Sequence, residues 1–562
     1  MAMSSFGPAE NSHAYILLTP WALFDRTPIP DGLGRRQLSL KEPVDVPSGW
    51  PLILAVPEGS RVDVDGRGLG SQQETNVFNL DCRRYTLHSL SIGTQEQDST
   101  MAIRLDDEVI GQVRISGHLP RPSWSLGRDR GRPTDPRQES LDLYLLGLVD
   151  LIRLAENPAV AWHESGWDRL SLAWTGDDVN LADPPMALIV RHADTMGRLL
   201  DDLGRHPRRI LSRTRAKTPV DRVQQLDITS VRWLSRQPGR DVYERAGPQQ
   251  RILSVRRFED LDTLENRVLR DLAIRSVEMS AAYTKQYKTF SNRRRWQKVN
   301  KYRRQCQRLG RTLRNSDIGL PRPPIVPNYA LLQEPRYRRI WRAYREIIRR
   351  LNERDECWRW QHRLWADFCR LLIQVALRGN HKFSAIAESP LQIASEQQRG
   401  RWSQVGAHSG TYLVHNNQDR PVAVLSVLWD TTTDHPKLSP WMAGLGAAAV
   451  LHLQGLENDQ VGYLLLWPMH LFGAEEVDLR QIAKSGRRAL DNCAPVDIKA
   501  EGLVLVSNFD TSRIIAGRWT QRDGTVLATR LRAGYGNLRR DIESLGGWLH
   551  TIALRLVVGG PA

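Results

Sequence analysis

Two side chains with catalytic chemistry lie close together in the stretch FEDLDTLENRVLRDLA, which spans Phe258 to Ala273. Glu265 could serve as a general base in a hydrolase or nuclease, and Arg267 could stabilise a developing anion. On a helix, however, residues two positions apart point in different directions. We expect instead that Glu265 meets the positive end of the helix dipole, while Asn266 and Arg267 tie the first helical turn to neighbouring segments.

The same stretch carries the signals of a helix start. Asp262 and Thr263 are residue types that cap helix N-termini. Leu264, Val268 and Leu272 recur at intervals of four residues and form one apolar face. The sequence therefore predicts a helix that begins at the Glu-Asn-Arg triplet, with a structural rather than a catalytic role for that triplet.

Positive charge is concentrated in one part of the chain. The 562 residues include 79 Lys and Arg against 63 Asp and Glu, a net charge of +16. Between Ala281 and Arg350, 20 Lys and Arg stand against three acids, a local balance of +17. The rest of the chain is therefore close to neutral. Such a block is the electrostatic footprint of a surface that binds a polyanion.

Within this block, the residues from Thr284 to Asn315 mix cations with aromatic side chains. Their thin apolar spacing predicts a long exposed helix or helical hairpin that projects rather than packs. The cations could clamp phosphates while Trp296 or Tyr302 stacks on bases. The alternative is a solvated helix face whose aromatic residues pack on a neighbouring helix. The density of charge favours binding, with the candidate residues Arg293, Arg294, Arg295, Trp296, Lys298, Lys301, Tyr302, Arg303, Arg304, Arg308 and Arg311.

The composition excludes several functional classes. No apolar run approaches the ~18 to 20 residues that cross a bilayer. The N-terminus lacks the layout of a secretion signal, and five dispersed cysteines indicate a reducing cytoplasm. No CxxC pair, HExxH motif or GxxxxGK[ST] loop occurs, so neither a zinc site nor nucleotide hydrolysis is expected. We expect a cytoplasmic protein with no membrane span, no metal site and no cofactor.

Apolar patterning changes along the chain and predicts three regions. Residues 1–135 alternate short apolar runs with Gly, Pro and Asp turns, which indicates a β-rich domain able to fold alone as a docking module. A linker is expected from Pro120 to Ser140. Residues 136–378 have helical spacing, and residues 379–562 alternate β-branched runs with helices. The expected fold class is multidomain α+β, with a helical centre and an α/β C-terminal domain.

Five stretches in order resemble a family of domains of unknown function related to McrC, the nuclease subunit of McrBC-type restriction systems. The stretches are LLDDLGRHPRRIL, ITSVRWLSRQP, SVRRFEDLDTLENRVLRDLA, NYALLQEPRYRRIWRAYREI and WRWQHRLWADFCRLL. The resemblance covers roughly Leu143 to Ala376 and extends more weakly to the C-terminus. Its most specific element is D-T-x-E-N-R, followed about sixty residues later by L-Q-x-x-x-x-Y. The motif residues are Asp262, Glu265, Asn266, Arg267, Gln333 and Tyr337.

The resemblance implies a PD-(D/E)XK, restriction-endonuclease-like domain after the helical part, and work beside an AAA+ motor in phage defence. Such a nuclease needs an acid at one strand end and acid-x-Lys on the next strand, because two carboxylates hold Mg²⁺ and the lysine positions the attacking water. The strand TYLVHN offers Thr411 and Tyr412 instead, and PVAVLSVLWD offers Ser426 and Leu428. We therefore expect a degenerate, non-cutting domain.

An active site could survive only if other residues gathered a metal ion. The fallback residues are Glu388, Asp430, Asp434 and Lys437, with Asp419 as a further acid. Isolated acids at strand ends are usually solvated turn residues. This alternative is a Mg²⁺-dependent endonuclease with displaced ligands.

The sequence therefore predicts a nucleic-acid-binding, non-catalytic subunit of a prokaryotic antiphage defence or restriction complex. Its expected partners are DNA, duplex or single-stranded, and an AAA+ or nuclease partner protein. Besides the active endonuclease, a second alternative is an assembly scaffold for an AAA+ motor, whose basic block docks an acidic protein.

Overall fold

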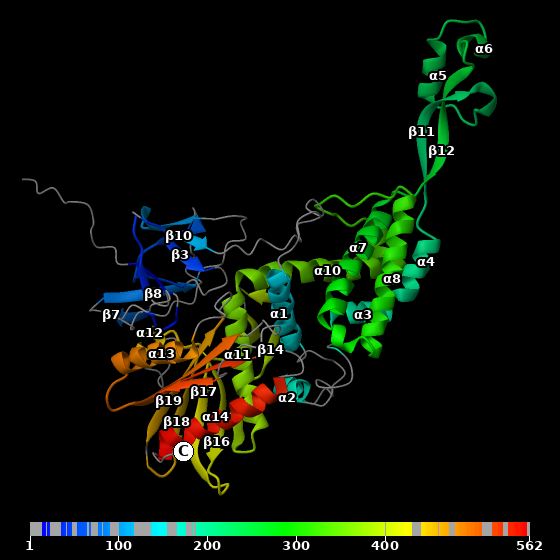
Figure 1. Ribbon diagram of the computed structural model, residues 1–562. Helices are drawn as coiled ribbons and strands as arrows, with labels where there is room; N and C mark the ends of the chain where they lie inside the picture. Colours follow the sequence, from blue (N-terminus) through cyan, green and yellow to red (C-terminus); the bar gives the residue numbers. More distant parts are fainter. Residues whose placement is uncertain are drawn as a thin grey trace, which may run out of the picture. The chain divides into compact units, whose positions relative to one another are not determined.

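A computed structural model shows how the chain folds (Figure 1). It describes residues 14–17, 19–22, 35–40, 42–47, 53–64, 67–68, 77–80, 83–89, 100–116, 136–153, 166–175, 184, 187–398, 401–429, 440–458, 460–470, 478–507, 520–531 and 538–558. Contacts divide the chain into a first unit, residues 1–185 with 351–562, and a second unit, residues 186–350. Helices and strands occur together in both units, which confirms the multidomain α+β class.

The N-terminal part of the first unit forms two five-stranded sheets, in the orders β2-β1-β4-β8-β7 and β3-β10-β9-β5-β6. Only the β3–β10 pair is parallel among the described strand pairs of these sheets. The β-rich character expected of this region is therefore confirmed. The strands are β1 (Tyr15–Leu17), β2 (Arg35–Gln37), β3 (Val44–Pro47), β4 (Ile53–Pro57), β5 (Val62–Val64), β6 (Arg67–Gly68), β7 (Val77–Leu80), β8 (Arg83–Ser89), β9 (Thr100–Leu105) and β10 (Glu108–Ser116).

The expected linker is shorter than predicted. Helix α1 (Pro136–Arg153) begins inside the stretch Pro120 to Ser140, so the last five residues of that stretch are helical. Proline suits the first position of a helix because its φ angle is fixed near the helical value and its missing N–H would have no partner there. Residues 120–135 lie outside the described part of the chain. The helix α2 (Gly166–Thr175) follows.

The C-terminal part of the first unit is built on an eight-stranded sheet, in the order β13-β16-β17-β18-β19-β20-β22-β21. Strands β19, β20 and β22 run parallel, and the other described pairs are antiparallel. The strands are β13 (Phe383–Glu388), β16 (His408–His415), β17 (Pro421–Leu428), β18 (Ala449–Gly455), β19 (Val461–Met469), β20 (Lys499–Ser507), β21 (Thr520–Asp523) and β22 (Val526–Leu531). A separate hairpin joins β14 (Gln392–Gln398) and β15 (Arg401–Gln404).

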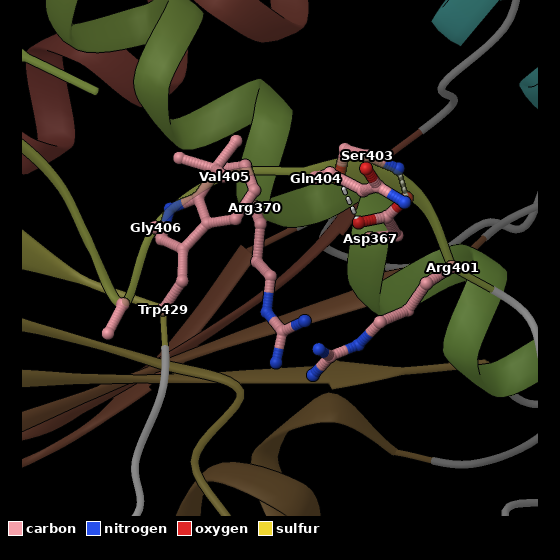
Figure 2. Close-up of a pocket in the computed structure, with 9 residues that line it drawn as sticks. Asp367, Arg370, Arg401, Ser403, Gln404, Val405, Gly406 and Trp429 are labelled. Carbon is pink, nitrogen blue, oxygen red and sulfur yellow. Dashed lines mark hydrogen bonds between the residues drawn. The ribbon is translucent and has the colours of Figure 1, made fainter. Parts of the chain in front are cut away.

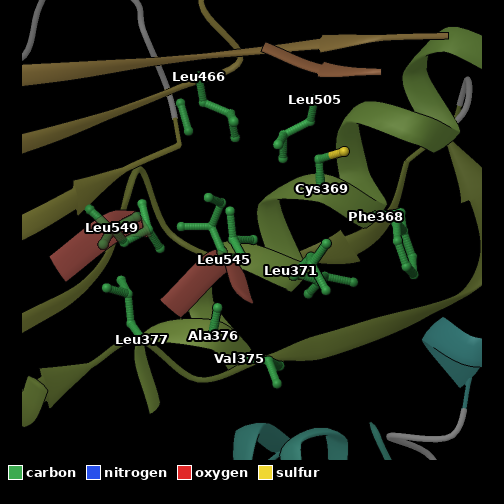
Figure 3. Packing of buried hydrophobic residues seen from close by; sticks show 14 of the residues in the cluster. Phe368, Cys369, Leu371, Val375, Ala376, Leu377, Leu466, Leu505, Leu545 and Leu549 are labelled. Atoms are coloured by element: carbon green, nitrogen blue, oxygen red, sulfur yellow. The ribbon is translucent and has the colours of Figure 1, made fainter. Parts of the chain in front are cut away.

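Both faces of this sheet are covered, which explains its nearly continuous apolar strands. Neighbouring residues on a strand point to opposite faces, and in β19 Leu464 and Leu466 join one core while Leu465 and Trp467 join another. Figure 3 shows side chains of the helices packed against Leu466 and the rest of the first core. The helices of this part are α11 (Gln361–Gly379), α12 (Pro440–Gly444), α13 (Leu479–Cys493) and α14 (Leu538–Val558).

The second of these cores also contains residues of the N-terminal sheets. The Trp21 ring lies 5.0 Å from the Trp467 ring, and Trp21 Nε1 donates to Ser485 Oγ at 2.8 Å. A Cβ at Gly446 would meet the Pro20 carbonyl at 2.7 Å, so only glycine permits this approach. In the described residues, the β-rich N-terminal region is thus built into the same unit as the C-terminal sheet, which differs from the independent docking module expected.

The second unit combines a helical bundle with a long two-stranded ribbon (Figure 1). The ribbon consists of β11 (Ile210–Pro219) and β12 (Arg251–Asp260), with α5 (Ile228–Ser235) and α6 (Val242–Arg245) at its far end. The helical pattern had predicted no strands between 136 and 378, so the ribbon corrects that expectation. The bundle contains α3 (Leu188–Thr195), α4 (Gly197–Arg205), α7 (Leu264–Gln286), α8 (Arg294–Asn315), α9 (Tyr329–Gln333) and the first part of α10 (Pro335–Arg359).

No helix in the described part of the chain is both long and apolar enough to span a bilayer.

Candidate nucleic-acid interface

Helix α8 packs into the bundle along one apolar stripe. Val299, Tyr302, Cys306, Leu309 and Leu313 are all buried and recur at intervals of three and four residues. This spacing places them on one face of a helix. The stripe lies against α7 and α4. The prediction that this segment projects rather than packs is therefore wrong, because five well-spaced apolar residues suffice for a complete helix seam.

The two aromatic residues expected to stack on bases form hydrogen bonds within the helical bundle. Tyr302 is 2% exposed and donates from its hydroxyl to Ser276 Oγ at 3.4 Å, and burial raises its pKa. Trp296 donates from Nε1 to the Thr284 carbonyl at 3.0 Å, which fastens the start of α8 to the end of α7. Tyr302 is therefore packed inside the bundle, as the alternative interpretation has it, whereas Trp296 is hydrogen-bonded to α7 and partly exposed.

The opposite face of α8 is an exposed line of cations. Lys301, Arg304, Arg308 and Arg311 are exposed and recur at intervals of three and four residues, so they form one straight row. At 1.5 Å per residue the row is ~15 Å long. None of the four forms an ion pair with a described residue. We call these four residues the α8 row.

Nothing on α8 itself neutralises this charge. The helix contains no Asp or Glu between its first and last residue. Like charges three or four residues apart on a helix repel one another by a few tenths of a kcal/mol per pair. A line of phosphates beside the row would replace this repulsion with attraction. Of the other predicted residues, Arg293 and Arg294 are exposed at the start of α8, and Lys298 forms an ion pair with Asp194 at 2.5 Å.

Arg295 and Arg303 are less suited to contact a ligand. Both are only partly exposed, and Arg303 has its Nε atom buried. Of the eleven predicted residues, the α8 row and the two arginines that precede it are therefore the exposed ones.

The ribbon adds cations that the sequence analysis did not select. Arg213 on β11 lies directly opposite Arg257 on β12, and both are exposed. Directly opposed residues share one face of a sheet, where like charges are unfavourable. Arg257 donates to Gln225 Oε1 at 2.9 Å, and Arg215, two residues along β11, pairs with Asp227 and holds the pKa of that carboxyl well below its usual range.

The charge of the second unit as a whole exceeds that of the block seen in the sequence. Residues 186–350 contain 39 Lys and Arg against 16 Asp and Glu, a net charge of +23. The rest of the chain contains 40 against 47, a net charge of −7. The signal that indicates these additional cations is the arginine content of residues 205–257, which lie before the basic block from Ala281 to Arg350.

The Glu-Asn-Arg triplet fixes the base of the ribbon. Asn266 is fully buried; its Nδ2 donates to the carbonyls of Arg208 and Leu261, each at 2.8 Å. Those two carbonyls lie just before β11 and just after β12. The Asn266 Oδ1 accepts from the Tyr337 hydroxyl at 2.7 Å, and that hydroxyl accepts from the Arg208 N–H at 2.9 Å. One buried amide thus joins both ends of the ribbon to α7 and α10.

The rest of the motif completes this joint. Thr263 caps α7, as predicted, by accepting from the Asn266 N–H. Arg267 donates two hydrogen bonds to the Asp262 carboxylate, at 2.8 and 2.6 Å, and lowers the pKa of that carboxyl. The same carboxylate also accepts from the Gly319 N–H.

Two further motif residues differ in their surroundings. Glu265 is buried and is held by Asn328 at 2.8 Å and by Arg208 at 3.2 Å. Gln333 is exposed at the end of α9. Asn266 and Arg267 thus tie the first turn of α7 to neighbouring segments, as the sequence predicts.

Residues 185–320 match a family model described as a domain of unknown function, DUF2357. The matched span contains α3, α4, the ribbon, α7 and α8, and therefore both basic surfaces and the first part of the motif. A search of curated proteins finds no match to this chain.

Of the four fallback nuclease residues, the structure describes only Glu388. Glu388, at the end of β13, accepts from the Tyr412 hydroxyl and pairs with Arg378. Arg378 pairs in turn with Asp168, and Gln374 donates to the Tyr412 oxygen at 2.6 Å. This network ties β13 to α11 and α2.

Asp430, Asp434 and Lys437 lie outside the described residues. Asp419 pairs with Lys382 at a turn. Within the described residues no group of three His, Cys, Asp or Glu is placed to hold a metal ion. At the positions where the two expected strands lack nuclease residues, Tyr412, Ser426 and Leu428 are buried in the sheet.

Proposed function

We propose that this chain binds nucleic acid through the basic surface of its second unit, as a non-catalytic, cytoplasmic subunit of a prokaryotic antiphage defence or restriction complex. One observation carries the proposal: the α8 row is exposed, lacks ion-pair partners among the described residues and lies on a helix without acids. Phosphate neutralisation by Lys and Arg supplies most of the non-specific affinity for nucleic acid. The resemblance to McrC-related proteins supports the setting in defence.

The role of the ribbon follows from its construction. Its base is locked by buried hydrogen bonds around Asn266, so its cations keep a fixed position on the second unit. A two-stranded β-ribbon fits the major groove of duplex DNA. We propose that the α8 row contacts the phosphate backbone. In this arrangement the cations of the ribbon make additional contacts with the same nucleic acid. The test is a titration of labelled duplex and single-stranded oligonucleotides with the full-length chain, repeated over a series of salt concentrations.

A second candidate function, assembly with a partner protein, is favoured by the far end of the ribbon. Four apolar residues there are strongly exposed: Ile228 (73%), Tyr243 (63%), Val231 (52%) and Val242 (43%). Exposed apolar clusters on a charged protein mark protein interfaces. In this second candidate function, the AAA+ or nuclease partner would dock on these apolar residues. A scaffold that used only this surface would not retain DNA, so the same titration separates the two functions.

We expect the purified chain not to cut DNA in the presence of Mg²⁺ or Mn²⁺. A catalytic ion needs converging carboxylates, and Glu388 is committed to Arg378 and Tyr412. Supercoiled plasmid and single-stranded DNA should remain intact after incubation with either ion. If nicking occurs and disappears in the variant Asp430→Ala, Asp434→Ala, Lys437→Ala, the alternative of an active Mg²⁺-dependent endonuclease replaces this proposal.

A further inference from the structure

Helix α10 carries a second line of exposed cations in the second unit. Its residues from Pro335 to Arg350 include seven arginines and one acid, Glu346. Arg338, Arg342 and Arg345 are exposed and recur at intervals of four and three residues, so they lie along one side of the helix. At 1.5 Å per residue the line is ~10 Å long. We call these three residues the α10 row.

The other side of α10 holds the helix in the bundle. Tyr337, Ile340, Tyr344 and Ile347 are buried and recur at intervals of three and four residues, which places them on one face. The Tyr344 hydroxyl donates to the Asp271 carboxylate of α7 at 2.7 Å. Because the α10 row lies opposite this buried stripe, it points away from α7, as the α8 row does.

The two rows lie on different sides of the bundle. Helix α8 is bonded to α7 at Ser276, through Tyr302, whereas α10 is bonded to α7 at Asp271. Five residues along a helix correspond to ~140° around its axis, since each residue advances by ~100°. The two helices therefore flank α7 on different sides, and the α8 and α10 rows form separate surfaces.

Other arginines of α10 are used within the protein. Arg336 pairs with Asp202 at 3.2 Å, and Arg339 donates to the Thr195 carbonyl at 3.0 Å. These contacts fasten α10 to α3 and α4. They leave the α10 row as a set of cations that the packing of the helix does not require.

The charge of the α10 row is only partly offset. The Glu346 carboxylate accepts from His192 Nε2 at 2.9 Å, and this bond, together with the nearby charge of Arg342, lowers the pKa of the Glu346 carboxyl. Arg338 and Arg345 form no ion pair with a described residue. A polyanion beside α10 would therefore meet two cations without an acidic partner and a third that shares one.

Arginines of the first unit are placed differently. Arg370 and Arg401 line a cavity of about 270 Å³ beside Asp367 (Figure 2). Both are only partly exposed, and Arg370 donates from Nε to the Ala448 carbonyl at 2.7 Å. The α10 row instead lies on an open helix surface, where one extended polyanion can reach all three cations.

We propose that the α10 row is a second phosphate-binding surface, so that one chain holds two segments of nucleic acid at once. The inference rests on the proposed binding of nucleic acid by the second unit and adds a second segment to it. Arginine presents a planar fork of donors that fits phosphate oxygens, and such contacts need no particular sequence. The α10 row has three cations against four on the α8 row, and Glu346 lies beside it, so it binds the weaker of the two segments.

The test is a bridging assay with the full-length chain. One duplex of about 12 base pairs is fixed to beads, and a second duplex of the same length carries a fluorophore. We expect the unmodified chain to retain the fluorescent duplex on the beads at 100 mM salt. Reversal of the α10 row removes three phosphate contacts and should lower this retention at least ~10-fold, while the α8 row still binds a single duplex. The variant is Arg338→Glu, Arg342→Glu, Arg345→Glu.

Two further variants control for net charge and for folding. The matched control reverses three exposed arginines of the first unit and should retain nearly as much duplex as the unmodified chain: Arg420→Glu, Arg480→Glu, Arg540→Glu. The other variant removes the charges of the α10 row without adding acids beside Glu346: Arg338→Gln, Arg342→Gln, Arg345→Gln. It should also lose bridging while its thermal unfolding midpoint stays unchanged, and it decides the test if the glutamate variant is unstable.

The outcomes distinguish this inference from the proposed function. If the chain binds the fixed duplex but retains no second duplex, the proposed function stands and the α10 row is not a second surface. Equal retention by the α10 variants and the unmodified chain would also overturn the inference, because bridging would then come from the association of two chains. If the chain binds neither duplex, the proposed function itself fails and the inference fails with it.

Discussion

Reversal of the α8 row to glutamate is expected to weaken the binding of DNA by the full-length chain strongly. The variant Lys301→Glu, Arg304→Glu, Arg308→Glu, Arg311→Glu replaces four phosphate contacts with four repulsions. We expect at least ~100-fold weaker binding at 100 mM salt. The fold should persist, because the four side chains are exposed and the apolar stripe of α8 is untouched. Fluorescence anisotropy with a labelled duplex measures the change.

The matched control applies the same change in net charge to the first unit. Arg420, Arg480, Lys484 and Arg540 are exposed there, and their reversal to glutamate should reduce affinity far less. If both variants weaken binding equally, net charge rather than the α8 row determines binding. If the α8 variant binds as tightly as the unmodified chain, the interface is assigned to the wrong surface.

Substitution of Asn266 by alanine is expected to loosen the base of the ribbon strongly. The change leaves the carbonyls of Arg208 and Leu261 and the hydroxyl of Tyr337 without their buried partner. Each unsatisfied buried group costs about 1–3 kcal/mol, so the free energy of local opening should fall by ~3 kcal/mol or more. Amides of β11 and β12 near their bases should then exchange hydrogen ~100-fold faster, as measured by mass spectrometry.

Two further variants provide a comparison for the exchange rate of Asn266→Ala. Tyr337→Phe removes only the hydroxyl and should accelerate exchange by a smaller factor, because Asn266 Nδ2 keeps both of its acceptors. Asn315→Ala changes an exposed asparagine at the end of α8 and should leave exchange at the ribbon base unchanged. An unchanged exchange rate in Asn266→Ala would show that the motif does not hold the ribbon.

Local sequence signals predicted the parts of the second unit that depend on local contacts. The start of α7 follows from a capping threonine and the apolar spacing of Val268 and Leu272, and both features are present in the structure. The structural role of Asn266 was predicted from its place in the first helical turn. Its partners, Arg208 and Tyr337, lie 58 and 71 residues away, so spacing alone could not identify them.

The sequence predicts that α8 projects from the protein, because its high charge content hides a sparse apolar stripe. In the structure that stripe packs into the bundle. A helix with this much arginine has a low mean hydropathy, yet a seam of five residues, among them Tyr302 and Cys306, is enough to bury one face. Burial raises the pKa of the Cys306 thiol to about 12, as expected of a cysteine inside such a seam. The cations of the α8 row are exposed, whereas Tyr302 lies inside the seam.

The ribbon and the shared core of the first unit depend on contacts between distant residues. The sequence of β11, ILSRTRAKTP, lacks the apolar alternation of a half-buried strand, because most of its described residues are exposed. The contact between Trp21 and Trp467 joins residues more than four hundred positions apart. The spacing of apolar residues along the sequence shows that such a tryptophan is suited to a core, but it does not show which sheet the tryptophan packs against.

The central claim, binding of nucleic acid by the second unit, is tested most directly by the salt dependence of the association constant. If six phosphates are neutralised, the logarithm of the association constant for a duplex should fall with the logarithm of salt concentration at a slope of about −5. The α8 variant should lose about one unit of slope per removed contact, and its two remaining phosphate contacts should give a slope of about −2. A slope near zero for the unmodified chain, or the same slope in both proteins, would contradict the account.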